Sequence, residues 1–239
     1  MVYEKNLTIN YYDLDGRGDV KLTAMLRHIN LAAGHNSEEI GAGLDTTTPL
    51  GLAFVLQRFG LRVFKWPIYR QTVKIRTWPA DIAKSTFRRN GDMWSLDGKK
   101  IAEWTGLWVL IDIKERKVKK PKALPIDIPV YGQMDVGVEV RKSDIPENAS
   151  PDVSYLHTVR FSELDINMHM NNAVYGDLIT NIMEMAKAEP ISRRSEIQFN
   201  YLSEAKMGDD IEVGLMQNGS KLCVTGTIGE RRIFGAEVI

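Results

Sequence analysis

The sequence predicts an α+β fold in which one arrangement, a long helix followed by antiparallel strands, is made twice. Apolar residues recur at helical spacing in two stretches, near residues 22–33 and 175–186, and strand-like segments follow each of them. A proline-rich connection separates the two arrangements. The predicted boundaries are residues 1–125 for the N-terminal copy, 126–150 for the linker and 151–239 for the C-terminal copy.

In the first copy, Asp19 is a candidate helix N-cap and Gly34 is the predicted helix end. Asn90-Gly91 and Asp97-Gly98 are predicted to form hairpin turns. The predicted strands are Leu61–Phe64, Thr72–Trp78, Ala83–Arg89, Met93–Leu96 and Lys100–Ile113.

In the second copy, a helix is predicted to start at Asn172 and to end before Pro190. The predicted strands are Ser195–Leu202, Ile211–Met216, Lys221–Ile228 and Arg231–Val238. The copies share local detail, because Leu14-Asp15 and Leu164-Asp165 each precede a helix. Val73-Lys74-Ile75 and Ile211-Glu212-Val213 occupy similar places in a later strand. Pairing of the two copies would cover sheet surface that each would otherwise expose.

Bulk composition narrows the function. The chain has 239 residues, 44% of them hydrophobic, and 31 basic residues balance 31 acidic ones. Zero net charge argues against a protein whose main work is electrostatic attraction to nucleic acid. Cys223 is the only cysteine, which excludes an intramolecular disulfide and fits a reducing, cytoplasmic setting. Neither a signal peptide nor an apolar run long enough to span a membrane is expected.

The segment from Asp165 to Asn172 carries polar and apolar residues in alternation. In an extended backbone, Asp165, Asn167 and His169 would share one face, beside the start of the following helix. A carboxylate, an amide and an imidazole next to unpaired backbone N–H groups could stabilise a developing oxyanion. A polar strand end with Asn172 as a helix cap fits the same spacing. Spacing alone leaves both interpretations open.

Several motifs in order resemble the acyl-acyl carrier protein (acyl-ACP) thioesterases, the plant FatA/FatB type and their bacterial relatives. The first is Asp165-x-Asn167-x-His169-x-Asn171-Asn172-x-x-Tyr175. The others are Val55–Phe59, Lys65–Pro67, Thr72–Trp78, Trp108-Val109, Glu115–Pro121 and Asn200–Ala205, so that the resemblance covers roughly Val2 to Val213. It implies a tandem (double) hotdog fold and a thioester hydrolase that ends fatty acid biosynthesis by releasing free fatty acid.

The resemblance assigns catalytic roles to Asp165, Asn167, His169 and Glu204. Ala205 stands where plant members carry a cysteine, so a cysteine nucleophile at this position is excluded. We therefore expect water to attack the thioester, with His169 and Glu204 orienting and deprotonating it and either one acting as the formal base. No cofactor is implied, and no set of ligands has metal-binding spacing.

Substrate contacts are assigned with the same resemblance in view. Backbone N–H groups near Asn171 and Asn172 are expected to stabilise the oxyanion. The first copy is expected to set acyl-chain selectivity. Guesses at its apolar wall are Met25, Leu26, Ile29, Phe54, Trp78 and Trp108. Tryptophans are more often core residues than ligand contacts, although some could line an acyl tunnel.

The implied partner is an acyl carrier protein bearing a fatty acyl chain. Because that partner is acidic, a basic surface would steer it. Lys114–Lys122 is the densest basic run, and Arg193-Arg194 and Arg231-Arg232 are its rivals. No nucleic acid or membrane span is expected, and both a monomer and a homodimer fit the tandem fold.

Three alternatives stay open. An acyl-CoA thioesterase would use similar residues. A hotdog dehydratase also needs a histidine and an acid, but would not need the whole Asp165–Asn172 arrangement. A non-catalytic acyl-binding protein is disfavoured by the intact polar residues, and a sensor would be expected to carry an output segment, for which we expect no room.

Overall fold

The computed structural model describes residues 2–134, 136, 138–146 and 150–239. Contacts within the chain define two compact units. Unit 1 comprises Met1–Asn10 and His28–Val140, and unit 2 comprises Tyr11–Arg27 and Arg141–Ile239. These boundaries differ from the predicted ones, because residues 11–27 group with the second copy and most of the predicted linker groups with the first.

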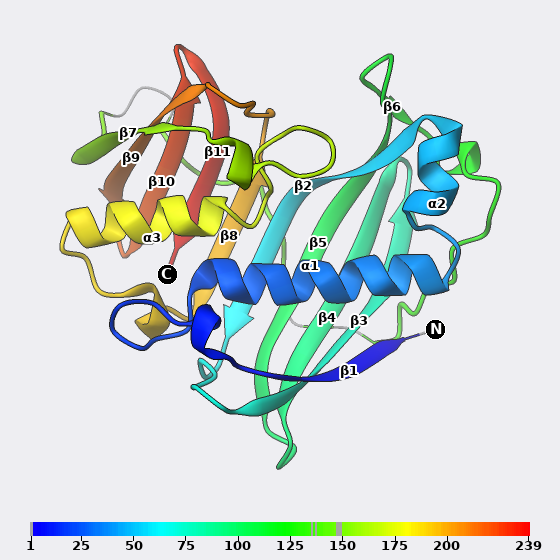
Figure 1. Cartoon of the computed structure of the whole chain (residues 1–239), viewed down its shortest axis with the longest axis horizontal. Coiled ribbons are helices and arrows are strands. Elements are labelled where there is room, and N and C mark those ends of the chain that lie inside the picture. The colour runs from blue at the N-terminus through cyan, green and yellow to red at the C-terminus, as the bar shows by residue number, and fades with distance from the viewer. Residues whose placement is uncertain (1, 135, 137, 147–149) are drawn as a thin grey trace. The chain divides into compact units, whose positions relative to one another are not determined.

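Unit 1 is an antiparallel sheet in the order β1-β3-β4-β5-β2, with β6 paired to β5. Helix α1 (Leu22–Glu39) runs across one face of this sheet (Figure 1). Its other elements are β1 (Tyr3–Thr8), α2 (Leu44–Thr47), β2 (Leu52–Val63), β3 (Thr72–Ala83), β4 (Thr86–Ser95), β5 (Lys100–Asp112) and β6 (Lys117–Lys119). The predicted Lys100–Ile113 corresponds to β5, and β2 and β3 are longer than predicted. The predicted strands Ala83–Arg89 and Met93–Leu96 are wrong in their division, because residues 84–85 form a turn and one strand, β4, follows. β1 and β6 were not predicted.

Three sequence predictions for the first copy are wrong. Asp19 is not the N-cap, because α1 begins at Leu22. Helix α1 does not end at Gly34 but continues to Glu39, and its last turns carry the fully buried Asn36. Tertiary burial of that face outweighs the helix cost of one glycine, about 1 kcal/mol. Asn90-Gly91 is not a turn but lies inside β4. Gly91 is required there because the Trp104 ring would lie 2.2 Å from any Cβ atom. Asp97-Gly98 does form the predicted turn, with Gly98 at φ +84°.

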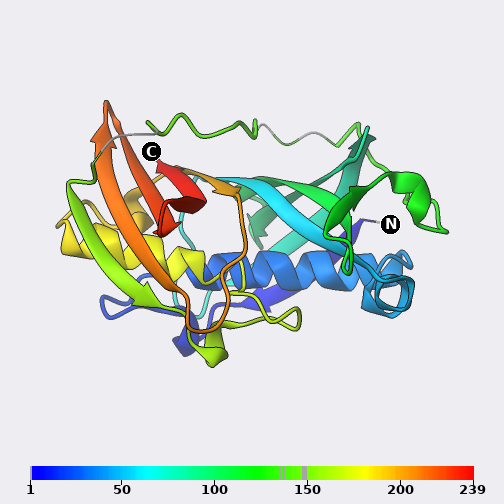
Figure 2. The ribbon, with the colours of Figure 1, turned by 90° about the horizontal axis from the view of Figure 1, so that it is seen from above.

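The connecting segment is the part of the chain that follows β6. Its described residues in unit 1 cover the face of the sheet that lies opposite α1. Figure 2 shows α1 and this segment on the two sides of the sheet. Trp78 packs on this outer side against Tyr131, Met134 and Val136. Its indole N–H donates to the Met134 carbonyl at 3.2 Å. Tyr131, Met134 and Val136 of the connecting segment are therefore part of the packed structure of unit 1.

Unit 2 repeats the plan with the sheet order β8-β11-β10-β9-β7 beside helix α3 (Tyr175–Met185). Its strands are β7 (Val153–Thr158), β8 (Glu196–Tyr201), β9 (Asp210–Asn218), β10 (Lys221–Ile228) and β11 (Arg231–Val238). The last two match the predicted bounds. Cys223 is fully buried, as expected of a core thiol. Of the described helices, none has the length and apolar character needed to cross a membrane.

The two sheets have the same strand order, and the pairing of their first strands has the same register. In unit 1, β1 pairs with β3 so that Leu7 lies opposite Val73. In unit 2, β7 pairs with β9 so that His157 lies opposite Ile211. The predicted correspondence of Val73-Lys74-Ile75 with Ile211-Glu212-Val213 is thus confirmed. Each copy is one hotdog, a helix with an antiparallel sheet around it.

The first turns of α1 pack within unit 2. Thr23 donates its hydroxyl proton to Asp177 of α3 at 2.5 Å. A Cβ atom at Gly176 would lie 3.0 Å from the Thr23 backbone nitrogen and 3.2 Å from Leu26. The glycine therefore allows close approach of the two helices at this point.

A buried carboxylate anchors the connecting segment in unit 2. The Glu237 side chain is fully buried and pairs with Arg141 and Lys221, each at 3.1 Å. It also accepts the Asp144 N–H at 2.6 Å. Burial alone would raise the pKa of Glu237, but these hydrogen bonds outweigh burial and lower it.

We predict that Glu237→Gln lowers the free energy of unfolding by about 1–3 kcal/mol at pH 7. Because the folded pKa is depressed, this stabilisation is present above the unfolded value of 4.5 and is lost as pH falls through the folded pKa. Urea denaturation at pH 7 and below pH 4.5 measures the difference in free energy of unfolding between the wild type and the variant. Glu230→Gln, at an exposed turn, is the control. If this difference is the same at acid pH as at pH 7, the ionised Glu237 carboxylate is not the source of the stabilisation.

Candidate functional site

The segment Leu164–Met170 forms a tight loop closed by an antiparallel bridge between its ends. The Asp165 carboxylate accepts the backbone N–H of Asn167 at 2.8 Å and that of His169 at 3.5 Å. The Asp165 N–H donates to the His169 carbonyl at 2.8 Å. Met168 closes the turn with φ +61°, in the left-handed region. The prediction of an extended backbone here is therefore wrong.

The cause of the turn is the aspartate itself. Aspartate side chains accept hydrogen bonds from N–H groups two residues further on, and so favour a turn over an extended strand. As a result Asp165 faces into the loop, Asn167 is exposed, and His169 leaves the loop half-buried. The three side chains do not line up on one strand face.

His169 meets Glu204. The imidazole Nε2 lies 3.0 Å from the Glu204 carboxylate, with side-chain exposures of 18% and 30%. The two loops are also joined by the backbone, because the Met170 N–H donates to the carbonyl of the buried Ala205 at 2.8 Å. An imidazole and a carboxylate in this geometry can share and transfer a proton. Among the described residues, no group of three His, Cys, Asp or Glu side chains could hold a metal ion.

The start of the following helix is arranged differently from the prediction. Helix α3 begins at Tyr175, not at Asn172. The Asn171 N–H donates to the Glu163 carbonyl at 2.9 Å, and the Asn171 side chain accepts the Ala173 N–H at 2.9 Å. The backbone N–H of Asn171 is thus engaged in the fold and not available to an oxyanion.

Aromatic residues support the junction between loop and helix. The Tyr201 hydroxyl donates to the Asn172 carbonyl at 3.1 Å, and its ring meets Tyr175 edge-on at 5.4 Å between centroids. Burial raises the pKa of Tyr201 well above 10. Burial, and then the charge of Asp165, raises the pKa of Tyr175 as well. Both residues stand in the quoted motifs, but sequence reasoning assigned them no role.

The first copy carries the same loop with different side chains. Asp15 accepts the N–H groups of Arg17 at 2.8 Å and Asp19 at 3.0 Å. Gly18, at φ +83°, stands where the second loop has Met168. Arg17 pairs with Glu184 at 2.5 Å, and Asp19 accepts the Ser192 hydroxyl at 2.5 Å. The duplicate loop therefore serves as packing, and the paired histidine and carboxylate occur at the second loop.

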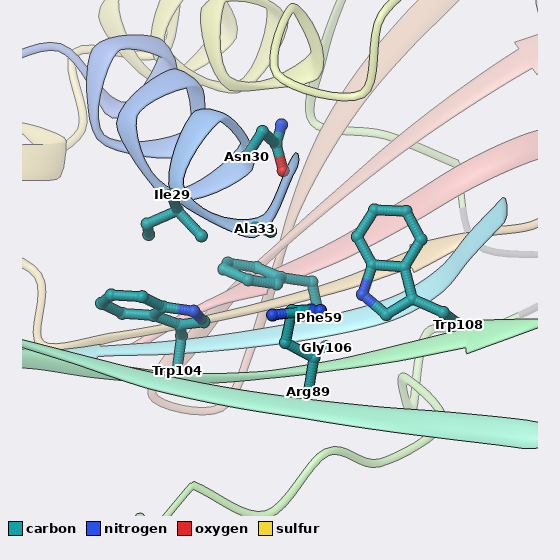
Figure 3. A pocket seen from close by; sticks show the side chains of 8 residues that line it. All are labelled: Ile29, Asn30, Ala33, Phe59, Arg89, Trp104, Gly106 and Trp108. Carbon is teal, nitrogen blue, oxygen red and sulfur yellow. The ribbon is translucent and has the colours of Figure 1, made fainter. Parts of the chain in front are cut away.

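Unit 1 contains a narrow apolar pocket between α1 and the sheet (Figure 3). Its enclosed volume is only about 10 Å³, room for about one water molecule. The lining residues are Ile29, Asn30, Ala33, Phe59, Arg89, Trp104, Gly106 and Trp108. Of the six residues predicted to form an acyl wall, Ile29 and Trp108 line this pocket. The other four do not: Trp78 is on the opposite sheet face, Met25 and Leu26 are buried in unit 2, and Phe54 packs in the cluster around Phe87.

Arg89, which sequence reasoning missed, closes part of the pocket. Its guanidinium donates to Asn36 at 2.6 Å and to Ser37 at 3.2 Å. Burial lowers its pKa to about 10. Gly106 leaves space on the floor, because a Cβ atom there would lie 2.9 Å from the Trp108 indole nitrogen. The pocket is therefore an apolar slot with one polar end.

The sequence matches two known protein families, one in each half of the chain. The family described as acyl-ACP thioesterase N-terminal domain matches residues 1–123, and the family described as acyl-ACP thioesterase C-terminal domain matches residues 147–228. Acyl-[acyl-carrier-protein] hydrolase FATB2, chloroplastic, of Cuphea viscosissima is 24% identical over 190 residues, covering 73% of this chain and 45% of that protein. Palmitoyl-acyl carrier protein thioesterase, chloroplastic, of Arabidopsis thaliana is 24% identical over 187 residues, with the same coverage of 73% and 45%. The chain spans about half the length of the curated relatives it matches.

Solved structures agree on the fold. An acyl-ACP thioesterase from Bacteroides thetaiotaomicron has a TM-score of 0.79 at 19% identity, covering 100% of this chain and 97% of that one. The 12:0-ACP thioesterase from Umbellularia californica has a TM-score of 0.81 at 18% identity, covering 99% and 96%. The fold is thus that of a double-hotdog protein. The chain belongs to the acyl-ACP thioesterase family.

We predict that Tyr201→Phe destabilises unit 2 by about 1–2 kcal/mol, because it leaves the Asn172 carbonyl without its donor while keeping the ring packing. Chemical denaturation measures this change. Tyr12→Phe, whose ring is 87% exposed, is the control and should leave stability unchanged. Equal effects of the two substitutions would argue against an anchoring role for Tyr201.

Proposed function

We propose that this protein hydrolyses the thioester of acyl-acyl carrier protein and releases free fatty acid. The observation that carries the proposal is the 3.0 Å contact between His169 Nε2 and the Glu204 carboxylate, in a chain of this family. A thioester needs little acid assistance to its leaving thiolate, so a positioned base for water is the main requirement.

In the proposed reaction, water bound beside the His169–Glu204 pair attacks the thioester carbonyl. The pair accepts the proton, with either residue as the formal base, and the tetrahedral intermediate collapses by expelling the carrier's thiolate. Ala205 leaves no thiol beside Glu204, so the water route is the one these side chains support. Asp165 holds the loop in shape through its backbone hydrogen bonds.

The oxyanion needs a donor other than the Asn171 N–H, which the Glu163 carbonyl already occupies. We assign this task to the side-chain amide of Asn167. This residue is exposed and precedes Met168 by one position and His169 by two. One such donor contributes about 3 kcal/mol to lowering the barrier. Asn171 then acts through the fold, since its side chain shapes the approach to α3.

The pocket of unit 1 is the proposed wall for the acyl chain. Its lining by Ile29, Phe59 and Trp108 suits a hydrocarbon. Its enclosed volume of about 10 Å³ is far below the roughly 300 Å³ at the low end of small-molecule sites, so the slot has to widen before it can take an acyl chain. Chain selectivity would then depend on the bulk of its aromatic lining.

An acyl carrier protein is the proposed partner, and a cytoplasmic setting is supported by the reduced Cys223. The predicted basic run is partly neutralised, because Lys119 pairs with Asp112 and Glu115, each at 3.2 Å. Of the rival pairs, Arg232 donates to the Pro146 carbonyl and Arg231 to Ser203. These arginines therefore help to hold the fold.

We predict that His169→Ala and Glu204→Ala each reduce turnover of acyl-ACP by about 10²–10⁴-fold while the protein remains folded. His157→Ala is a matched control, because His157 forms a second histidine–glutamate pair with Glu163 at 3.1 Å. Its turnover should remain within a few-fold of wild type. Thiol release from matched acyl-ACP and acyl-CoA substrates measures the effect. Near-normal turnover in both site variants would refute the mechanism. A preference for acyl-CoA would show that the substrate is acyl-CoA and not acyl-ACP.

We further predict that Trp108→Phe raises turnover of longer acyl groups relative to shorter ones by roughly 10-fold, because it enlarges the pocket. Trp78→Phe is the matched control on the opposite sheet face and should leave the ratio unchanged. The ratio of kcat/KM across an acyl series from C8 to C18 is the measurement. A shift with Trp78→Phe alone would place the acyl chain elsewhere.

A further inference from the structure

The loop at residues 15–19 of the first copy and the loop at residues 165–169 of the second copy differ in side-chain size at two positions. Their backbones make matching hydrogen bonds around Asp15 and Asp165. The first loop carries Gly16 and Gly18 where the second carries Ile166 and Met168. A Cβ atom at either glycine would meet nothing within 4 Å, so both positions face open space.

The larger side chains of the second loop are unfavourable in the isolated chain. Ile166 is 73% exposed and Met168 is 55% exposed, so both leave apolar surface in water. Met168 also adopts φ +61°, a conformation that glycine enters at less cost. The duplicate loop demonstrates that this backbone folds with glycines. The side chains therefore do not serve the fold of the loop.

A neighbouring loop extends this surface. The Met170 N–H to Ala205 carbonyl bond sets the two loops side by side. Met207 is 59% exposed, and Lys206 beside it is exposed as well. Ile166, Met168, Met207 and Lys206 together are called the loop-tip patch. Its residues flank the His169–Glu204 pair in sequence, since Met168 adjoins His169 and Lys206 lies two residues from Glu204.

We propose that the loop-tip patch is the docking surface for the acyl carrier protein, an inference that rests on the proposed function. A carrier protein that delivers a thioester to His169 must rest on the surface next to the pair. Exposed apolar side chains with one lysine fit a partner that presents apolar groups among acidic ones. Covering Ile166 and Met168 would remove from water the surface that the free chain exposes.

The test exchanges the two side chains for those of the duplicate loop, as Ile166→Gly, Met168→Gly and the double variant. Binding of holo-carrier protein without an acyl group, measured by calorimetry, should weaken about 10-fold in the double variant. KM for acyl-ACP should rise to a similar extent while kcat stays within about threefold. Turnover of the same acyl group on coenzyme A should stay unchanged. Met185→Ala, an exposed methionine at the end of α3, is the matched control and should change none of these values.

Lys206→Glu tests the charge independently of the glycines. It should weaken carrier binding more at low salt than at high salt, because exposed charges are screened. Unchanged carrier binding in the double variant overturns the proposal. So does an equal fall in kcat on both substrates, which would place the side chains in support of the His169–Glu204 pair. If the wild-type protein binds the carrier through the loop-tip patch but does not hydrolyse acyl-ACP, the docking proposal is supported and the proposed activity is rejected.

Discussion

The Asp165 carboxylate holds the loop from which His169 projects, and the other features of the site depend on that hold. A charged acceptor bound to backbone N–H groups makes hydrogen bonds roughly twice as strong as neutral ones, so one side chain fixes the path of several residues. The loop end is then tied to Ala205, which brings Glu204 within 3.0 Å of His169. Asp15 forms the same arrangement in the first copy, where no histidine follows. The loop is therefore a reusable scaffold, and its chemistry lies in the residues placed on it.

Much of the fold was predictable because periodicity and turn residues repeat in both copies. The second-copy strands Lys221–Ile228 and Arg231–Val238 match their predictions because apolar side chains alternate there and turn residues flank them. Gly34 and Asn90-Gly91 misled for different reasons. Gly91 is required inside β4 because the Trp104 ring leaves no room for a Cβ atom, whereas a Cβ atom at Gly34 would meet nothing within 4 Å, and α1 continues through it because its later turns are buried.

The residues of the site were predictable as a set, but their geometry was not. Alternation in Asp165–Asn172 imitates a strand, while the aspartate side chain competes for the backbone and bends it. The contact of His169 with Glu204 joins residues far apart in sequence, and only the resemblance to a family pointed to it. The tryptophans illustrate a similar limit. Trp78 and Trp108 are equally apolar in sequence, yet the linker covers one and the other lines the pocket. Sequence alone does not indicate which sheet face a later segment will cover.

The grouping of residues 11–27 with unit 2 limits how this protein can be divided. Thr23 hydrogen-bonds Asp177, Asp19 hydrogen-bonds Ser192, and Gly176 gives close access to the backbone of α1. A gene cut at the linker would leave the C-terminal half without these partners, although it retains every residue of the proposed reaction. Removal of the N-terminal copy would therefore also take away part of the packing of the C-terminal one.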